Sequence, residues 1–201
     1  MTRLEAIQAA CRITDTCLSH LLTLLPHHLT EKQLVAEARK FFRDHNATPA
    51  FPSIIAINSH SATPHHKVTD TKIKPHSLVL IDIGCRYHGY CSDLTRTIFI
   101  KKPTPLQHKI YAIVKRAHDS ALRHLRGGSA SSEVDEAARQ VITRAGYGKY
   151  FIHGTGHGVG RRIHQLPKIG PRATRSKLRA GMVITIEPGI YLPHRFGIRL
   201  E

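Results

Sequence analysis

The chain has 201 residues, of which 41% are hydrophobic and 22% charged, a balance typical of a globular domain with a sizeable core. No apolar run approaches the ~20 residues of a membrane span, and the N-terminal segment lacks the apolar core of a signal peptide. We therefore expect a cytoplasmic location without a membrane partner.

The charge is strongly basic, with 30 Lys and Arg against 14 Asp and Glu and a formal net charge of +16. Such a charge attracts nucleic acid and other polyanions. The basic residues are scattered, however, and the densest patch, over residues 172–179, has no aromatic residues interleaved for stacking. A solvated basic surface is favoured, so we do not expect nucleic acid as a partner despite the charge. None of the four cysteines forms a CxxC pair, which excludes a zinc finger.

The first third of the chain predicts two helices followed by a loop. Apolar side chains recur at helical spacing over residues 2–25. Thr30 begins a capping-box pattern for a second helix over residues 31–43. Residues 44–77 contain several prolines and are predicted to be mostly loop, with one short strand over residues 53–58.

Residues 78–100 are predicted to form a β-hairpin, the feature around which the rest of the chain is organised. Its two strands, Leu78–Ile83 and residues 90–100, are apolar and rich in β-branched residues. The polar residues 86–89 supply the turn.

Two carboxylates, Asp82 and Asp93, lie inside these apolar strands. A hairpin symmetric about Tyr87 and His88 would place them opposite each other, with Cβ atoms ~5 Å apart. Like charges at that separation need a cation between them, and a divalent metal supplies it economically. The hairpin alone leaves an alternative open, in which one Asp ends a strand and the other pairs with Arg96.

The second half of the chain repeats the order helix, helix, strand pair. A capping box at Thr104 predicts a helix that ends near Arg126, and a further helix begins at Ser129 or Ser131 and ends near Gly146.

A second strand pair is predicted over residues 182–187 and 196–201, and it also carries two carboxylates, Glu187 and Glu201. If the two halves face each other, four carboxylates meet at the centre of the molecule.

The segment over residues 151–164 is rich in glycine and histidine and holds His153, His157 and His164. Its glycines let the backbone approach a ligand closely or adopt positive φ. A lone histidine is more often structural than a ligand. Three in a glycine-rich run, beside four strand-borne carboxylates, favour a site with two divalent ions.

These residues, taken in order, resemble the pita-bread metallopeptidases, which include methionine aminopeptidase, aminopeptidase P and prolidase. The resemblance covers nearly the whole chain. It rests on five positions that match the family's metal ligands: Asp82, Asp93, His157 in HGTGH, Glu187 in TIEPG and Glu201 in GIRLE. It implies an α+β pita-bread fold, with two pseudo-symmetric halves of helices packed on a curved, largely antiparallel sheet.

Within that family the motifs YCSDLTRT, HGTGHGVG and IEPGIYLP are similar to those of the Xaa-Pro branch. We therefore expect an aminopeptidase or dipeptidase that removes the N-terminal residue from peptides with proline second. A methionine aminopeptidase is the first alternative, although that branch more usually shows a GDTSRTF-like strand and IEPM. A non-catalytic module that binds protein or nucleic acid is the second, although such relatives typically lose metal ligands.

The resemblance also implies a role for each residue. Asp93 and Glu201 would bridge two divalent ions, Asp82 would chelate one of them, and His157 and Glu187 would complete the other. Glu187 would also be the general base. The substrate-side residues implied are His65, His153, His164, Tyr191 and Arg199, of which His65 and His164 would stabilise the reacting carbonyl. The oxygen-rich ligand set favours manganese, with cobalt, iron and zinc as alternatives.

Three departures from the family accompany this resemblance. The Xaa-Pro enzymes usually carry an extra N-terminal domain, whereas residues 1–201 correspond to the catalytic domain alone. The segment after HGVG usually reads Leu-Glu-Ile-His-Glu and here reads RRIHQ. The family also continues its last strand beyond the position of Glu201. We therefore expect a catalytic domain truncated at its C-terminus. Separately, we expect a peptide as substrate and a homodimer as the assembly.

Overall fold

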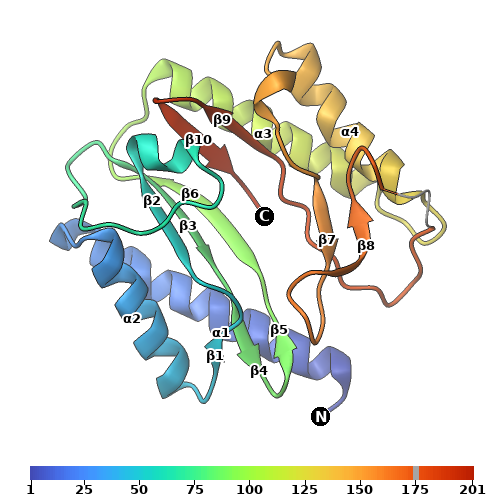
Figure 1. Ribbon diagram of the computed structural model, residues 1–201, viewed down its shortest axis with the longest axis horizontal. Coiled ribbons are helices and arrows are strands. Elements are labelled where there is room, and N and C mark those ends of the chain that lie inside the picture. Colours follow the sequence, from blue (N-terminus) through green and yellow to red (C-terminus); the bar gives the residue numbers. More distant parts are fainter. Residues whose placement is uncertain (174–176) are drawn as a thin grey trace.

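Four long helices lie on the outside of a central group of short strands in the computed structural model, which describes residues 1–173 and 177–201 (Figure 1). The helices are α1 (Arg3–Leu24), α2 (Glu31–Asp44), α3 (Pro105–His124) and α4 (Ser131–Arg144). The strands are β1 (Thr48–Pro49), β2 (Ile54–Ile57), β3 (Leu78–Ile83), β4 (Cys85–Tyr87), β5 (Tyr90–Cys91), β6 (Leu94–Phe99), β7 (Gly156–Gly158), β8 (Gln165–Ile169), β9 (Gly189–Leu192) and β10 (Phe196–Arg199).

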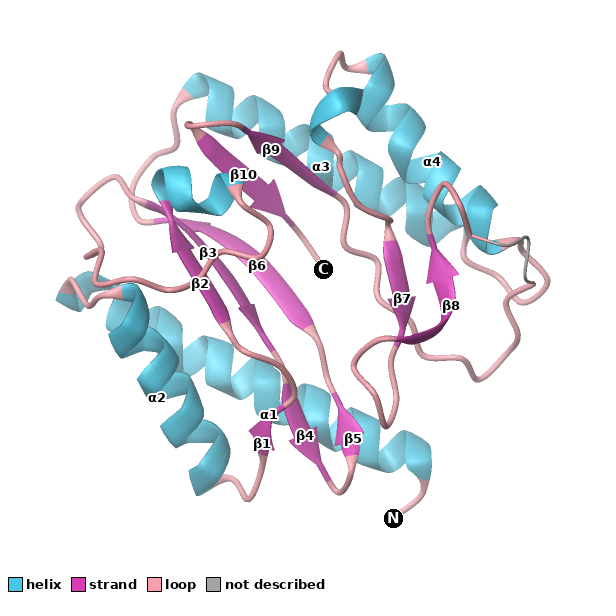
Figure 2. Cartoon of the chain, in the orientation of Figure 1, coloured by secondary structure: helices cyan, strands magenta, loops and turns pink. Residues whose placement is uncertain are grey.

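The two halves of the chain build similar units that face each other. α1 and α2 pack on one side of the strands and α3 and α4 on the other, and the chain ends between them (Figure 2). Each half has its own hydrophobic core, one formed mainly by α1, α2, β2 and β3 and the other by α3, α4, β9 and β10. The second helix of each half is 14 residues long. The predicted α+β fold with two pseudo-symmetric halves is confirmed.

The predicted helix starts are also confirmed. Thr30 accepts a hydrogen bond from the Gln33 amide at 3.1 Å, and the Gln33 side chain accepts one from the Thr30 amide at 2.8 Å. Thr104 makes the same reciprocal pair of bonds at the start of α3. These bonds satisfy amides that the helix itself leaves unpaired.

The hairpin forms, but its predicted register is wrong by two residues. Its turn lies at His88 and Gly89, both with positive φ, rather than at Tyr87 and His88. Asp82 therefore pairs with Thr95 in the antiparallel ladder. The second strand is interrupted between β5 and β6, and Asp93 lies in that interruption, where it is free of the ladder.

The predicted strand pair of the second half is also shifted. Residues 182–187 are extended but pair with residues 155–159, through main-chain hydrogen bonds that include Glu187 N–H to the Thr155 oxygen at 2.7 Å. β9, which begins after Pro188, is instead the partner of β10. Glu187 therefore precedes the strand pair and lies beside the glycine- and histidine-rich segment.

β10 brings the two halves together at the centre. The Arg199 amide donates to Thr97 Oγ1 at 3.2 Å, and the Glu201 amide donates to the Thr95 main-chain oxygen at 3.1 Å. The last strand of the second half therefore lies beside β6 of the first half.

Along the described part of the chain, no helix is long and apolar enough to cross a lipid bilayer. Residues 174–176, within the basic patch at 172–179, lie outside the described residues.

Candidate metal centre

Three carboxylates from three separate segments meet at the centre of the molecule. Asp82 comes from β3, Asp93 from the interruption before β6, and Glu201 from the second residue after β10. One carboxylate oxygen from each lies within 4.8 Å of the others. All three line a cavity of about 1540 Å³ between the two halves. The pair that the hairpin register was expected to bring together is close, although the register itself differs.

The surroundings of these carboxylates favour a bound cation. Burial and then the neighbouring Asp82 raise the pKa of Asp93 to about 8, and burial together with Asp93 raises the pKa of Glu201 well above its ordinary value. Glu201 Oε1 is buried and has no hydrogen-bond partner among the described residues. A divalent ion would supply both the charge and the missing partner, so this donor set fits a metal.

His157 and Glu187 form the other side of the same centre. His157 Nε2 lies 3.2 Å from Glu187 Oε1 and 3.6 Å from Asp93 Oδ2. The other ring nitrogen, Nδ1, donates to the Gly158 main-chain oxygen at 3.1 Å, which aims Nε2 at the carboxylates. Burial lowers the pKa of His157, but the hydrogen bond that its Nε2 donates to the Glu187 carboxylate outweighs burial and raises that pKa. Burial raises the pKa of Glu187, and the same bond outweighs it and lowers that pKa. All five expected ligands therefore lie together.

Two threonines that the sequence analysis missed hold the carboxylates in place. Thr95 Oγ1 donates to Glu201 Oε2 at 3.0 Å, and Thr185 Oγ1 donates to Glu187 Oε1 at 3.2 Å. Thr95 lies two residues after Asp93, and Thr185 lies two residues before Glu187. Alternation along an extended chain places such neighbours on one face, a signal that could have identified them.

Arg199 connects the carboxylates to the expected substrate side. Its Nη2 donates to Asp82 Oδ2, and its Nη1 donates to the Tyr191 hydroxyl at 2.9 Å. Tyr191 in turn lies 2.8 Å from His153 Nε2, and His153 Nδ1 donates to the Gly154 main-chain oxygen at 2.7 Å. Burial lowers the pKa of His153, so its ring is neutral and accepts the Tyr191 proton at Nε2. Tyr191 is buried behind His153.

His65 and His164 are both exposed and line the cavity. The His164 ring lies 4.4 Å from the His157 ring in an edge-to-face arrangement. His65 belongs to the loop before β3 and interacts electrostatically with Asp82, His153 and His164. The structure therefore brings the expected substrate-side histidines to one cavity.

Arg96, the alternative partner for an Asp, donates instead to the main-chain oxygens of Thr95 and Glu201.

Glycine is needed in the HGTGH segment for close approach and not for positive φ. A Cβ at Gly156 would lie 2.0 Å from the Thr185 main-chain oxygen, and one at Gly158 would lie 2.4 Å from the Leu166 oxygen. β7 therefore fits between its two neighbours only because these residues have no side chain.

An ion pair in α4 between the buried Asp135 and the partly exposed Arg139, which the sequence analysis also missed, holds this segment. Asp135 accepts hydrogen bonds from Arg139 at 2.8 and 3.0 Å and from the Thr155 amide and hydroxyl at 3.0 and 2.7 Å. Arg139 also donates to the main-chain oxygens of Phe151 and His153. Asp135 and Arg139 have the i, i+4 spacing that many exposed ion pairs on helices also have. The sequence pattern therefore gave no signal that the Asp135 carboxylate is buried.

A model of metallopeptidase family M24 matches residues 5–201 of this chain. The chain belongs to metallopeptidase family M24. A Xaa-Pro dipeptidase of Pyrococcus furiosus is 40% identical to this M24 chain over 199 residues. Two solved structures are also similar, the Xaa-Pro dipeptidase from Bacillus anthracis (35% identity, TM-score 0.95) and an X-Pro aminopeptidase from Thermotoga maritima (34% identity, TM-score 0.94).

These matches cover 98% of this M24 chain but only 57% of the Pyrococcus furiosus protein and 56% of each of the two solved chains. The chain thus spans somewhat more than half the length of the relatives it matches.

Proposed function

We propose that this protein is a metal-dependent peptidase that binds two divalent ions and hydrolyses the bond between an N-terminal residue and a following proline. The observation that carries the proposal is the meeting of Asp82, Asp93 and Glu201 with His157 and Glu187 in one cavity. The names of the similar proteins support the Xaa-Pro branch over a methionine aminopeptidase.

Asp82, Asp93, His157, Glu187 and Glu201 would hold the two ions of the proposed site. Bound divalent ions supply a water of lowered pKa and polarise the scissile carbonyl. The mixture of carboxylates with one imidazole suits manganese, and also cobalt, iron or zinc.

The chain's own groups then move the proton and hold the substrate. Glu187 accepts the proton of the attacking water at a carboxylate oxygen and passes it to the leaving proline nitrogen. His65 and His164, exposed at the cavity, donate hydrogen bonds to the carbonyl oxygen as negative charge develops there.

His153 and Arg199 line the cavity on the substrate side, and Tyr191 is buried and hydrogen-bonded to both of them. Because Tyr191 is buried, it acts through His153 and fixes that ring rather than touching the peptide. Arg199 balances the charge of Asp82 and orients the Tyr191 hydroxyl.

The test is hydrolysis by the manganese-loaded protein of Ala-Pro, Ala-Pro-Ala and Met-Ala-Ser, with products separated by chromatography. We expect cleavage of the first two between residues one and two, and their ratio separates a dipeptidase from an aminopeptidase. Cleavage of Met-Ala-Ser alone would assign the methionine branch. No cleavage of any peptide, with metal bound, would favour a non-catalytic module.

A further inference from the structure

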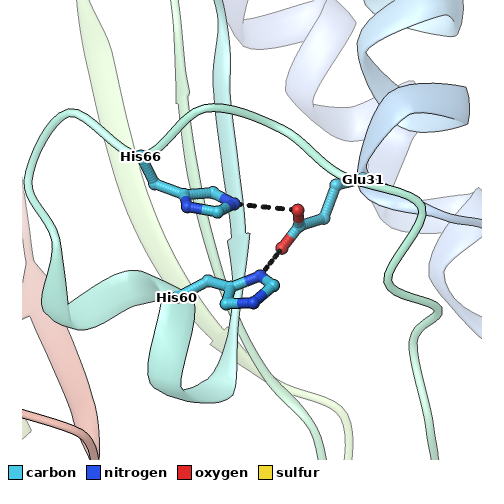
Figure 3. A group of neighbouring side chains, drawn as sticks. All are labelled: Glu31, His60 and His66. Atoms are coloured by element: carbon cyan, nitrogen blue, oxygen red, sulfur yellow. Dashed lines mark hydrogen bonds and ion pairs between the residues drawn. The ribbon is translucent and has the colours of Figure 1, made fainter.

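The carboxylate of Glu31, the first residue of α2, is fully buried and accepts five hydrogen bonds, of which Figure 3 shows the two from His60 and His66. Oε1 accepts from the Ile57 amide at 2.9 Å and from His60 Nδ1 at 2.7 Å. Oε2 accepts from His66 Nε2 at 2.9 Å and from the Thr69 amide and hydroxyl, both at 2.8 Å. One carboxylate thus holds four residues spread over a loop of the first half.

These bonds require the charged form of Glu31. An ionised carboxylate offers only acceptors, and all five of its partners are donors. Burial raises the pKa of Glu31, but the bonds from His66 and His60 and from the two amides outweigh it and lower the pKa. The first turn of a helix also favours negative charge. The buried charge is therefore fully satisfied, and removing it would leave several donors without a partner.

The side chains of Glu31, His60 and His66 are also of the types that bind a cation, and their ligand atoms lie within 4.8 Å of one another. The geometry argues against it. The two histidine nitrogens bond to different oxygens of the carboxylate, and the rings are stacked with centroids 4.4 Å apart and planes 26° apart. Each histidine nitrogen is thus already paired with a carboxylate oxygen of its own. The cluster is a hydrogen-bond hub.

The loop that this hub holds carries His65. His66, the next residue, is anchored on Glu31, and Thr69 fixes the loop three residues further on. His65 makes no hydrogen bond with the residues that the structure describes, is exposed, and lines the cavity. Its position at the centre therefore depends on the neighbours that Glu31 holds.

We infer that Glu31 is a positioning residue, which acts through His66 and Thr69 to keep the His65 imidazole aimed into the cavity. The inference rests on the proposed function, in which His65 donates to the substrate carbonyl. It assigns a role in catalysis to a carboxylate on the far side of the loop from the metal centre.

The first test reads the position of His65 without using activity. In protein labelled with ¹³C-histidine, we expect the His65 ring to give one sharp signal in the wild type, and that signal to shift and broaden in Glu31→Gln. Glu37→Gln, which removes a carboxylate from the same helix but makes only a 3.7 Å contact with His20, is the matched control. An unchanged His65 signal in Glu31→Gln overturns the inference, whether or not the protein is a peptidase.

The second test is a double-mutant cycle on hydrolysis of Ala-Pro-Ala. We expect Glu31→Gln to lower kcat by about 10- to 100-fold, the range for a misplaced catalytic group, with little change in KM. In a His65→Ala background the same change should have almost no further effect. Equal losses in both backgrounds contradict the inference. If wild-type protein cleaves none of the peptides, the proposed function fails and the labelled-histidine result alone decides the role of Glu31.

His66→Phe is a milder variant in case Glu31→Gln does not fold. It keeps a ring to stack on His60 and removes only one donor. It should change the His65 signal and lower kcat in the same direction, by less. Glu31→Gln and His66→Phe could both lose a bound ion while the central ions remain. That result would show that Glu31, His60 and His66 form a cation site, and the inference drawn from their hydrogen bonds would be wrong.

Discussion

Arg139 donates from Nη2 to the main-chain oxygen of His153 at 2.7 Å while the same guanidinium binds the buried carboxylate of Asp135. Asp135 in turn binds the amide and hydroxyl of Thr155. The segment that carries His153 and leads to His157 is thus fixed by a side-chain pair of α4. The first half has its counterpart in Glu31, so each half uses an acid of its second helix to hold a histidine-bearing loop.

Replacing Arg139 with Met should destabilise the protein by about 3–5 kcal/mol, because it leaves the Asp135 carboxylate buried without its cation. Arg144→Met, which removes an arginine from the same helix that donates only to Gln140, should change stability by less than about 0.5 kcal/mol. Urea unfolding of both variants provides the comparison. Similar stabilities for the two variants would show that the Asp135–Arg139 pair does not support the segment.

The metal-free protein should lose stability as the pH rises from about 5 to 8. The folded-state pKa of Asp93 is about 8 and that of Glu201 is also raised, so the folded state holds protons that the unfolded chain releases near pH 4. Their contribution is fully present below the unfolded pKa and is lost as pH rises through the folded pKa.

Asp93→Asn isolates this effect from the histidines that titrate in the same range. The difference in Tm between wild type and Asp93→Asn, both in chelator, should move against the wild type with increasing pH. A difference that stays constant from pH 5 to 8 would show that Asp93 is not protonated in the folded, metal-free protein.

Gly156→Ala should disrupt the metal centre. Its new Cβ would lie 2.0 Å from the Thr185 main-chain oxygen, and the shift needed to relieve that contact would move both His157 and Glu187. Gly127→Ala, whose Cβ would meet its nearest atom at 3.7 Å, is the matched control. Calorimetric manganese titration should show weakened binding in the first variant and unchanged binding in the second. Tight binding by Gly156→Ala would mean that close approach at β7 is not required.

The five proposed ligands could be predicted from the sequence because each lies in a local motif. The hairpin register could not, because it depends on which two residues form the turn. His88 and Gly89 both adopt positive φ, a conformation that Asn-Gly or Asp-Gly would have signalled and His-Gly does not. The apolar run over residues 182–187 is extended, as its composition predicts, but nothing local to it indicates that residues 155–159 are its partner.

Glu31 and Asp135 were missed for a different reason. Acidic residues are common in the first turns of helices, where they interact favourably with the helix dipole or form exposed i, i+4 ion pairs. The presence of Glu31 and Asp135 there therefore indicates no special role. Their burial follows only from loops that pack on them from far along the chain, so no neighbouring residue signals it.

Glu187→Gln should keep an oxygen ligand and remove the proton acceptor. We expect turnover of Ala-Pro-Ala to fall by at least ~10², the scale of general-base catalysis, with the metal content retained. Asp119→Asn, on the exposed side of α3, serves as a control for loss of a carboxylate. Turnover of Glu187→Gln near that of the wild type would show that another group accepts the proton.

The most direct measurement of the metal centre is anomalous diffraction from crystals soaked in manganese. We predict two peaks ~3.5 Å apart, the spacing of co-catalytic metal sites, among the side chains of Asp82, Asp93, His157, Glu187 and Glu201. One peak alone, or peaks elsewhere in the molecule, would contradict a two-metal centre.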